Sequence, residues 1–199
     1  MHALLVIDVQ NDFCPNGALA VPGGDEIVEP INALMAQFDT VILTQDWHPA
    51  GHSSFASSHS EKAPFGQVDM PYGPQVLWPD HCVQGSYGAR FHPALNVDRA
   101  DLILRKGSNP SIDSYSALFE NDRQTPTGLE GYLRNRGIED LTLVGLATDY
   151  CVTYSALDAA RLGFSVQVRR DLCRAIDLDG SLHKALQEMQ NAGVRLSGT

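Results

Sequence analysis

Short, nearly continuous apolar runs constrain the fold of this chain more than any other feature of its sequence. Five of them are rich in Val, Ile and Leu, and a sixth, near the C-terminus, is weaker. A strand that is buried on both faces has no polar side, so such runs are typical of a parallel sheet covered by helices. The runs occupy residues 3–9, 41–44, 101–105, 141–146, 165–168 and 194–196.

Segments with helical spacing lie between most of these runs. Apolar residues recur at intervals of three and four residues in four of them, and a glycine follows each of the last three. We expect Thr127 to cap the second helix and Asp179 to precede the fourth. The alternation predicts one α/β domain over residues 1–199, with a parallel sheet and helices on both faces. The helical segments are 27–38, 129–133, 152–160 and 182–189.

Composition and charge exclude several classes of protein. The net charge of −10 argues against a surface that binds nucleic acid or an anionic membrane, because such surfaces need clustered Lys and Arg. No apolar run approaches the length of a membrane span, and the N-terminus lacks the basic region of a signal peptide. The four cysteines form no CxxC pair, so we expect free thiols and a cytoplasmic location.

The segment from residue 45 to residue 100 is a long excursion between two predicted strands. It holds most of the histidines, both tryptophans and many Gly, Pro and Ser residues. Connections of this length are usually functional or disordered. The aromatic and histidine content favours a functional region that binds metal.

Four chemically capable side chains lie at the ends of four predicted strands. They are Asp8, Asp46, Lys106 and Cys151. Each has an ordinary explanation taken alone: a turn acid, a solvated lysine or a buried structural thiol. Ligands of open parallel sheets bind outside the carboxyl ends of the strands, and all four residues are expected there. Their coincidence at one edge therefore favours an active site.

Cys151 is the candidate nucleophile. It follows a strand-to-helix turn in which Thr148 or Asp149 is the expected N-cap, so the helix dipole would favour the thiolate. A neighbouring Lys106 would lower the thiol pKa further, and Asp8 could accept the proton. The other three cysteines lack this setting and are expected to be structural: Cys14, Cys82 and Cys173.

Asp46, His48 and His81 form a candidate metal site. Asp46 and His48 are two residues apart, side by side in an extended segment. Two histidines and a carboxylate with open positions suit a reactive divalent ion, with Zn²⁺ first and Fe²⁺ or Mn²⁺ as alternatives. His52 is left open between a fourth ligand and a hydrogen-bonding role beside the site.

Four segments of the chain resemble the nicotinamidases. These enzymes also deaminate pyrazinamide, and they belong to the isochorismatase-like cysteine hydrolase superfamily. The resemblance extends over essentially the whole chain. The Asp8, Lys106 and Cys151 positions mark the superfamily, and the Asp46–His48 pair with His81 narrows the match to nicotinamidases. The segments are DVQNDF at 8–13, DWHPAGHSSF at 46–55, WPDHC at 78–82 and GLATDYCV at 145–152.

The resemblance implies a fold, a reaction and further site residues. The fold is a three-layer sandwich with a six-stranded parallel sheet. The reaction hydrolyses nicotinamide to nicotinate and ammonia through a thioester on Cys151, and it feeds NAD salvage. A cis peptide before Ala147 would present the N–H groups of Ala147 and Cys151 as an oxyanion hole. The metal would bind the pyridine nitrogen, while Phe13 and Trp78 pack on the ring.

Three other functions remain open from the residues. A second hydrolase of the same superfamily, acting on isochorismate, a carbamoyl amine or a ureido compound, would need the Asp, Lys and Cys positions but no metal. A metallohydrolase would attack with a metal-bound hydroxide and leave Cys151 accessory. A binding module without activity would keep the fold alone. Assembly into a homo-oligomer is also open.

Overall fold

The computed structural model of the chain describes residues 1–198, and its centre is a six-stranded sheet in which every pair of neighbours is parallel. The strand order is β5-β2-β1-β6-β7-β8, as the apolar runs predict for an α/β sandwich. The strands are β1 His2–Ile7, β2 Thr40–Asp46, β5 Leu102–Lys106, β6 Asp140–Leu146, β7 Ser165–Arg174 and β8 Arg195–Ser197.

The central strands are buried along nearly their whole length. In β1 only His2 is exposed, and every residue of β2 is buried. Burial on both faces explains why these runs are continuous in the sequence rather than alternating. β7 extends well beyond the predicted run, because a register shift between Leu143 and Gly145 allows it to continue pairing with β6.

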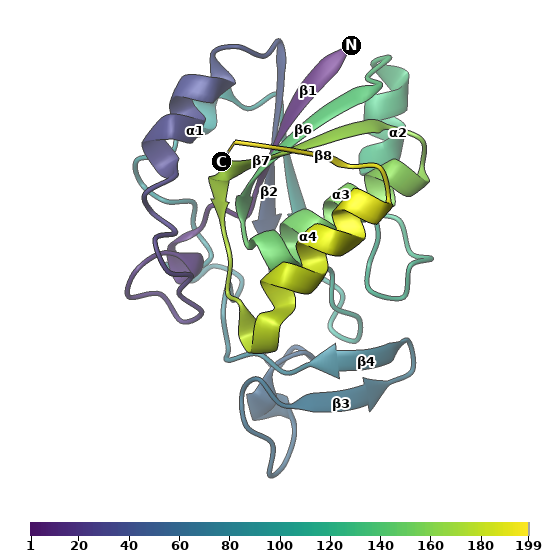
Figure 1. Cartoon of the computed structure of the whole chain (residues 1–199). Helices are drawn as coiled ribbons and strands as arrows, with labels where there is room; N and C mark the ends of the chain where they lie inside the picture. Colours follow the sequence, from purple (N-terminus) through teal and green to yellow (C-terminus); the bar gives the residue numbers. More distant parts are fainter. Residues whose placement is uncertain (199) are drawn as a thin grey trace.

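Four helices connect the strands. Figure 1 shows α3 and α4 lying together across one face of the sheet. The connection through α1 leads from β1 to β2, toward one edge of the sheet, and the connection through α3 leads from β6 to β7, toward the opposite edge. Because crossovers between parallel strands are right-handed, α1 and α3 lie on opposite faces of the sheet. The helices are α1 Val28–Met35, α2 Leu129–Asn135, α3 Thr153–Arg161 and α4 Ser181–Asn191.

One predicted helix cap is wrong, that of Thr127 at the second helix, whereas Asp179 does precede the fourth helix as expected. The residue before α2 is Gly128, which takes a positive φ of 95°, although the Thr127 hydroxyl does accept a hydrogen bond from the Leu129 N–H. Gly180 precedes α4, and Asp179 lies in a short 3-10 turn with a φ of 51°. In both places the residue directly before the helix is a glycine with a positive φ, a conformation that glycine adopts without steric cost.

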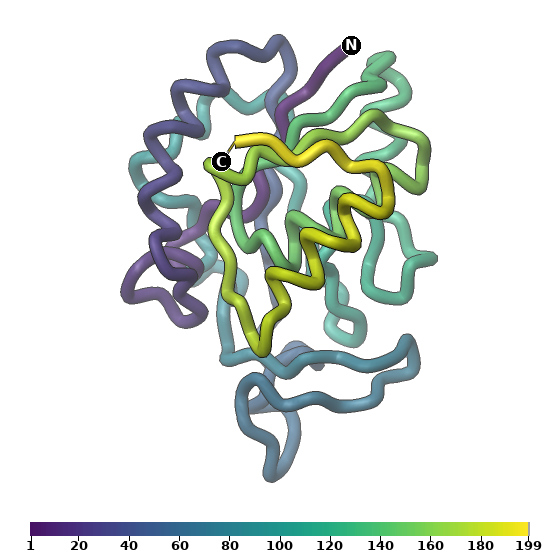
Figure 2. The backbone as a smooth tube through the Cα atoms, viewed as in Figure 1, coloured from purple at the N-terminus to yellow at the C-terminus, as the bar shows by residue number. Residues whose placement is uncertain are grey.

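The excursion between β2 and β5 contains a hairpin that the sequence did not predict. Strands β3 (Gln67–Met70) and β4 (Gly73–Val76) pair antiparallel and form a separate two-stranded sheet. Figure 1 shows this hairpin beyond the edge of the main sheet at which β2 ends, and Figure 2 shows the chain leaving and rejoining the sheet around it. Within residues 1–198, no helix is long and apolar enough to cross a membrane.

Candidate active site

The sheet brings the predicted catalytic residues together at its carboxyl edge. Asp8 follows the last residue of β1, while Asp46 and Lys106 are the last residues of β2 and β5. Cys151 lies beyond β6, which pairs with β1. The connection that follows β1 leads to β2 on one side of this pair, and the connection that follows β6 leads to β7 on the other side. A crevice at such a point is where open α/β sheets bind ligands.

Lys106 is the buried cation of this cluster. Its ammonium group donates hydrogen bonds to Asp46 Oδ1 at 2.6 Å, to the Ser114 carbonyl at 2.8 Å and to Cys151 Sγ at 3.5 Å. Asp8 Oδ2 lies 2.9 Å from the same nitrogen. Burial opposes the charge on Lys106, but Asp46 and Asp8 outweigh it and hold the pKa of the ammonium well above its ordinary value.

Asp8 is arranged to accept a proton. Its Oδ1 receives a hydrogen bond of 2.6 Å from the Thr44 hydroxyl. Its Oδ2 forms a buried ion pair with the Lys106 ammonium at 2.9 Å, and a carboxylate oxygen in such a pair keeps a second lone pair. Burial raises the pKa of this carboxyl, and Lys106 offsets only part of the effect. Asp8 therefore combines a free lone pair with an increased affinity for a proton.

The environment of Cys151 corrects two expectations. Neither Thr148 nor Asp149 caps the helix: Ala147 precedes a π-helical turn over Thr148–Val152, and Asp149 accepts the backbone N–H groups of Ile176 and Asp177 instead. The thiolate is not the favoured resting form. Burial raises the pKa of the Cys151 thiol well above its ordinary value, and the nearby Lys106 lowers it only in part. The nucleophile therefore needs a base.

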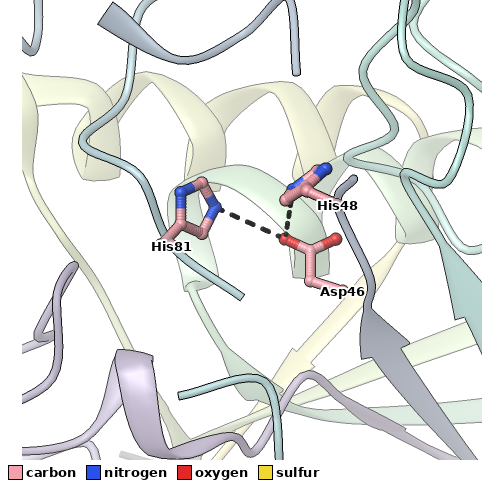
Figure 3. A group of neighbouring side chains, drawn as sticks. All are labelled: Asp46, His48 and His81. Atoms are coloured by element: carbon pink, nitrogen blue, oxygen red, sulfur yellow. Dashed lines mark ion pairs between the residues drawn. The ribbon is translucent and has the colours of Figure 1, made fainter. Parts of the chain in front are cut away.

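The predicted metal ligands converge on one carboxylate oxygen. Asp46 Oδ2 lies 3.3 Å from His48 Nε2 and 3.6 Å from His81 Nε2, and Figure 3 shows both rings directed at it. The opposite nitrogens contact backbone carbonyls, His48 Nδ1 that of Gly107 at 2.9 Å and His81 Nδ1 that of Pro79 at 2.8 Å. A carbonyl only accepts, so each Nδ1 carries a hydrogen, and Nε2 is the ring nitrogen that each histidine directs at the carboxylate. That arrangement fits a divalent cation.

Gly107 is required by the position of His48. Its φ is 68°, and a Cβ atom there would lie 2.5 Å from His48 Cε1. Only glycine therefore lets the turn after β5 pass behind the imidazole and present its carbonyl to Nδ1.

His52 does not have a free nitrogen for a metal. Its Nδ1 is contacted by the Ser54 backbone N–H at 3.2 Å and by the Ser54 hydroxyl at 2.8 Å, so Nδ1 accepts. Its Nε2 then carries the hydrogen and donates to the Asn109 carbonyl at 2.7 Å. Of the two roles left open by the sequence, the hydrogen bonds favour the one beside the site.

A cavity joins the cysteine to the metal ligands. It is lined by the predicted site residues Phe13, Trp78, Ala147 and Cys151, and by Asp46 and His81. The Leu146–Ala147 peptide is cis, as the resemblance implied. Sequence reasoning missed five further lining residues: Tyr150 lies within the GLATDYCV segment but was given no role, and the other four lie in none of the four segments. These are Leu19, Asp113, Tyr115, Tyr150 and Ile176.

Comparison with known proteins is consistent along the whole chain. The isochorismatase domain model matches residues 2–199. A nicotinamidase of Acinetobacter baylyi is 55% identical over 97% of this chain and 90% of its own length. A solved nicotinamidase/pyrazinamidase of Acinetobacter baumanii superposes with a TM-score of 0.98 at 53% identity, over 99% of this chain and 95% of that one. A pyrazinamidase of Pyrococcus horikoshii solved in complex with zinc has a TM-score of 0.78 at 35% identity, over 100% of this chain and 99% of that one.

Proposed function

This chain belongs to the isochorismatase-domain family, and from that premise we propose that it is a nicotinamidase in which Cys151 is the nucleophile. It hydrolyses nicotinamide to nicotinate and ammonia, and pyrazinamide in the same way. One observation carries the assignment: a single cavity is lined by Cys151, which pairs with Lys106, and by Asp46 and His81, which group with His48 as metal ligands. The other hydrolases of the family considered above would not need that second group.

The first half of the reaction acylates the thiol. Asp8 takes the proton of Cys151, and the sulfur attacks the carboxamide carbon of the substrate. A carboxylate oxygen of Asp8 lies within 4.8 Å of Sγ, and the Lys106 ammonium stabilises the two anions between which the proton moves. The N–H groups of Ala147 and Cys151 hold the oxyanion, each donor contributing about 3–4 kcal/mol. Asp8 then gives its proton to the departing ammonia.

The second half releases the acid. Asp8, again a carboxylate, removes a proton from a water that attacks the thioester carbon. The carbon–sulfur bond breaks, nicotinate leaves and the proton returns to the sulfur. The raised pKa of Asp8 suits a group that must accept and donate a proton once in each half.

The aromatic wall of the cavity fits a flat ring. Phe13 and Trp78 line it from two different segments, and Tyr115 and Tyr150 pack edge-on against Trp78. Asp46, His48 and His81 would hold the metal, with Zn²⁺ the first choice from the ligand types. When bound, the ion supplies a Lewis acid for the pyridine nitrogen and so orients the ring. The protein residues carry every proton transfer.

The direct test is product formation by the purified, metal-loaded and reduced protein. Nicotinamide and pyrazinamide should release ammonia and the corresponding acids, whereas isochorismate, carbamoyl amines and ureido compounds should be poor substrates. Preference for one of the latter would move the assignment to another activity of the same family.

Replacing Asp8 by Asn is expected to decrease kcat/KM for nicotinamide by about 10²- to 10⁴-fold. The amide keeps the oxygen that accepts the Thr44 hydroxyl but cannot take the thiol proton. Steady-state assays of ammonia release measure the loss, and the metal content should remain that of the wild type. A variant with nearly full activity would show that another group deprotonates Cys151.

Replacing His48 by Ala is expected to remove the metal, whereas His52→Gln should retain it. His48 offers a free Nε2 to the site, and both nitrogens of His52 are occupied by hydrogen bonds. Elemental analysis of the two purified variants measures metal per chain. Loss of metal from the His52 variant and retention in the His48 variant would reverse our ligand assignment.

We place the enzyme in the cytoplasm, as one domain over residues 1–199, where nicotinate would feed pyridine-nucleotide salvage. The four cysteines are free in the structure, which suits a reducing compartment. Fractionation of cells and comparison of NAD levels with and without the gene would test both points.

A further inference from the structure

Asp113 is a buried carboxylate to which the proposed reaction gives no role. It lies in the segment between β5 and α2, lines the substrate cavity and is 2% exposed. A charged group at such a position is retained only if something compensates its charge. The question is therefore which group Asp113 serves.

The hydrogen-bond partners of Asp113 are neutral. Its Oδ1 accepts the Ser114 backbone N–H at 2.8 Å, and its Oδ2 accepts Gln75 Nε2 at 2.9 Å. Among residues 1–198 no Lys or Arg pairs with it, and the nearest ionisable nitrogen is His48 Nε2, 4.0 Å from Oδ1. A carboxylate oxygen can accept two hydrogen bonds, so both oxygens keep a free acceptor site.

Charge around the cavity is unbalanced by the side chains alone. Three carboxylates, Asp8, Asp46 and Asp113, are almost completely buried, and Lys106 is the buried ammonium that faces them. Lys106 pairs with the first two and has no contact with the third. Among residues 1–198, Asp113 is therefore the one of these three carboxylates that no buried ammonium pairs with.

His48 connects Asp113 to the cation site. Its Nε2 faces Asp46 Oδ2 at 3.3 Å and Asp113 Oδ1 at 4.0 Å, since Nδ1 is held by the Gly107 carbonyl. One group of mutually close ligand atoms comprises Asp46, His48 and His81, and a second comprises His48, His52 and Asp113. Asp113 therefore lies next to the ligand His48 but outside the group Asp46, His48 and His81.

We propose that Asp113 is the outer carboxylate of the cation site: it makes no direct bond to the ion, but balances its charge and accepts a hydrogen bond from a water that the ion holds. This inference rests on the ligand set of the proposed function. It deepens that function, because it assigns a residue that sets how tightly the ion is bound.

The hairpin fixes the orientation of this carboxylate. Gln75, on β4 and 1% exposed, donates to Asp113 and also to the Tyr115 hydroxyl at 2.9 Å. Trp78 Nε1 donates to the same hydroxyl at 3.0 Å. The side chain that positions Asp113 therefore also holds the aromatic wall, so the anion is in place before the ion binds.

The test is zinc affinity, measured by competition with a chelator on protein stripped of metal. Asp113→Asn should bind zinc about 10- to 100-fold more weakly than the wild type. Glu120→Gln is the matched control: it removes a charge from the same segment, outside the cavity, and keeps the hydrogen bond with Asn109. It should leave the affinity unchanged. Asp113→Glu, which keeps the charge, should bind zinc more tightly than Asp113→Asn.

The melting temperature with and without zinc separates a structural role from the proposed one. Our inference expects a smaller zinc-induced increase in Asp113→Asn, with the metal-free proteins melting close together. Unchanged zinc affinity would overturn it, as would an equal loss of stability with and without zinc. If Asp113→Asn does not fold, the zinc affinity of Asp113→Glu is compared with that of the wild type instead. A loss of zinc affinity in Asp113→Asn as large as that in His48→Ala would also overturn the inference, because it would make Asp113 a direct ligand. A wild type that binds zinc as expected but releases no ammonia from nicotinamide would instead count against the proposed function.

Discussion

Replacing Cys151 by Ala should abolish nicotinamide hydrolysis, decreasing kcat by about 10⁴-fold or more. Of the described residues that line the cavity, Cys151 is the one that carries a thiol, with Lys106 Nζ at 3.5 Å and Asp8 in reach. Because the side chain is buried and alanine is smaller, the fold and the metal ligands should survive. Ammonia release, zinc content and melting temperature measure the three outcomes.

Cys173→Ala is the matched control for this experiment. Cys173 is also buried, on β7, and burial raises its pKa to about 12, but it does not line the substrate cavity. Its loss should cost some stability and leave the turnover of the folded enzyme intact. Substantial hydrolysis by Cys151→Ala would instead favour the metallohydrolase mechanism. Mass spectrometry of the wild type quenched during turnover should find the acyl group on Cys151 only.

Replacing Lys106 by Met should decrease the free energy of unfolding by about 3–5 kcal/mol, because it leaves two buried carboxylates without their cation. The contacts concerned are those with Asp8 at 2.9 Å and Asp46 at 2.6 Å, and all three side chains are almost completely buried. Activity should also fall, since Lys106 stabilises both anions of the reaction. Urea unfolding at neutral pH, where both carboxylates are ionised in the unfolded chain, measures the change.

Lys184→Met tests whether any lost ion pair would have the same effect. Lys184 pairs with Glu188 one helical turn away at 3.8 Å, and its side chain is 78% exposed. Such pairs contribute about 0.3–0.5 kcal/mol, so the control should unfold at nearly the wild-type urea concentration. Equal, small changes in both variants would show that the buried cluster tolerates the loss of its cation, for instance by taking up protons.

Much of the sheet could be predicted because burial on both faces leaves a direct pattern in the sequence. The runs at 3–9 and 141–146 correspond to β1 and β6, and the capable residues follow such runs, so their convergence needed only the rule for parallel sheets. The hairpin β3–β4 left no such pattern. Seven of its eight residues are exposed or half-buried, so no continuous apolar run marks either strand.

The protonation of the nucleophile could not be predicted from neighbours in the sequence. A position after a strand and near Lys106 favours the thiolate, but the pKa of Cys151 is raised because burial costs the anion more than the lysine returns. Desolvation depends on everything that surrounds a group, and only the folded chain defines that. The same holds for His52, whose role follows from contacts with Ser54 and Asn109.

The sequence by itself determined which chemistry is present: a cysteine, a carboxylate and a lysine at strand ends, with a metal-binding group in the excursion between β2 and β5. These are local facts of residue type and order. The tertiary structure decided how the groups share charge, because buried ionisable groups interact over distances unrelated to chain separation. Asp113 is the clearest example, since only its burial beside His48 and its lack of a cation connect it to the site.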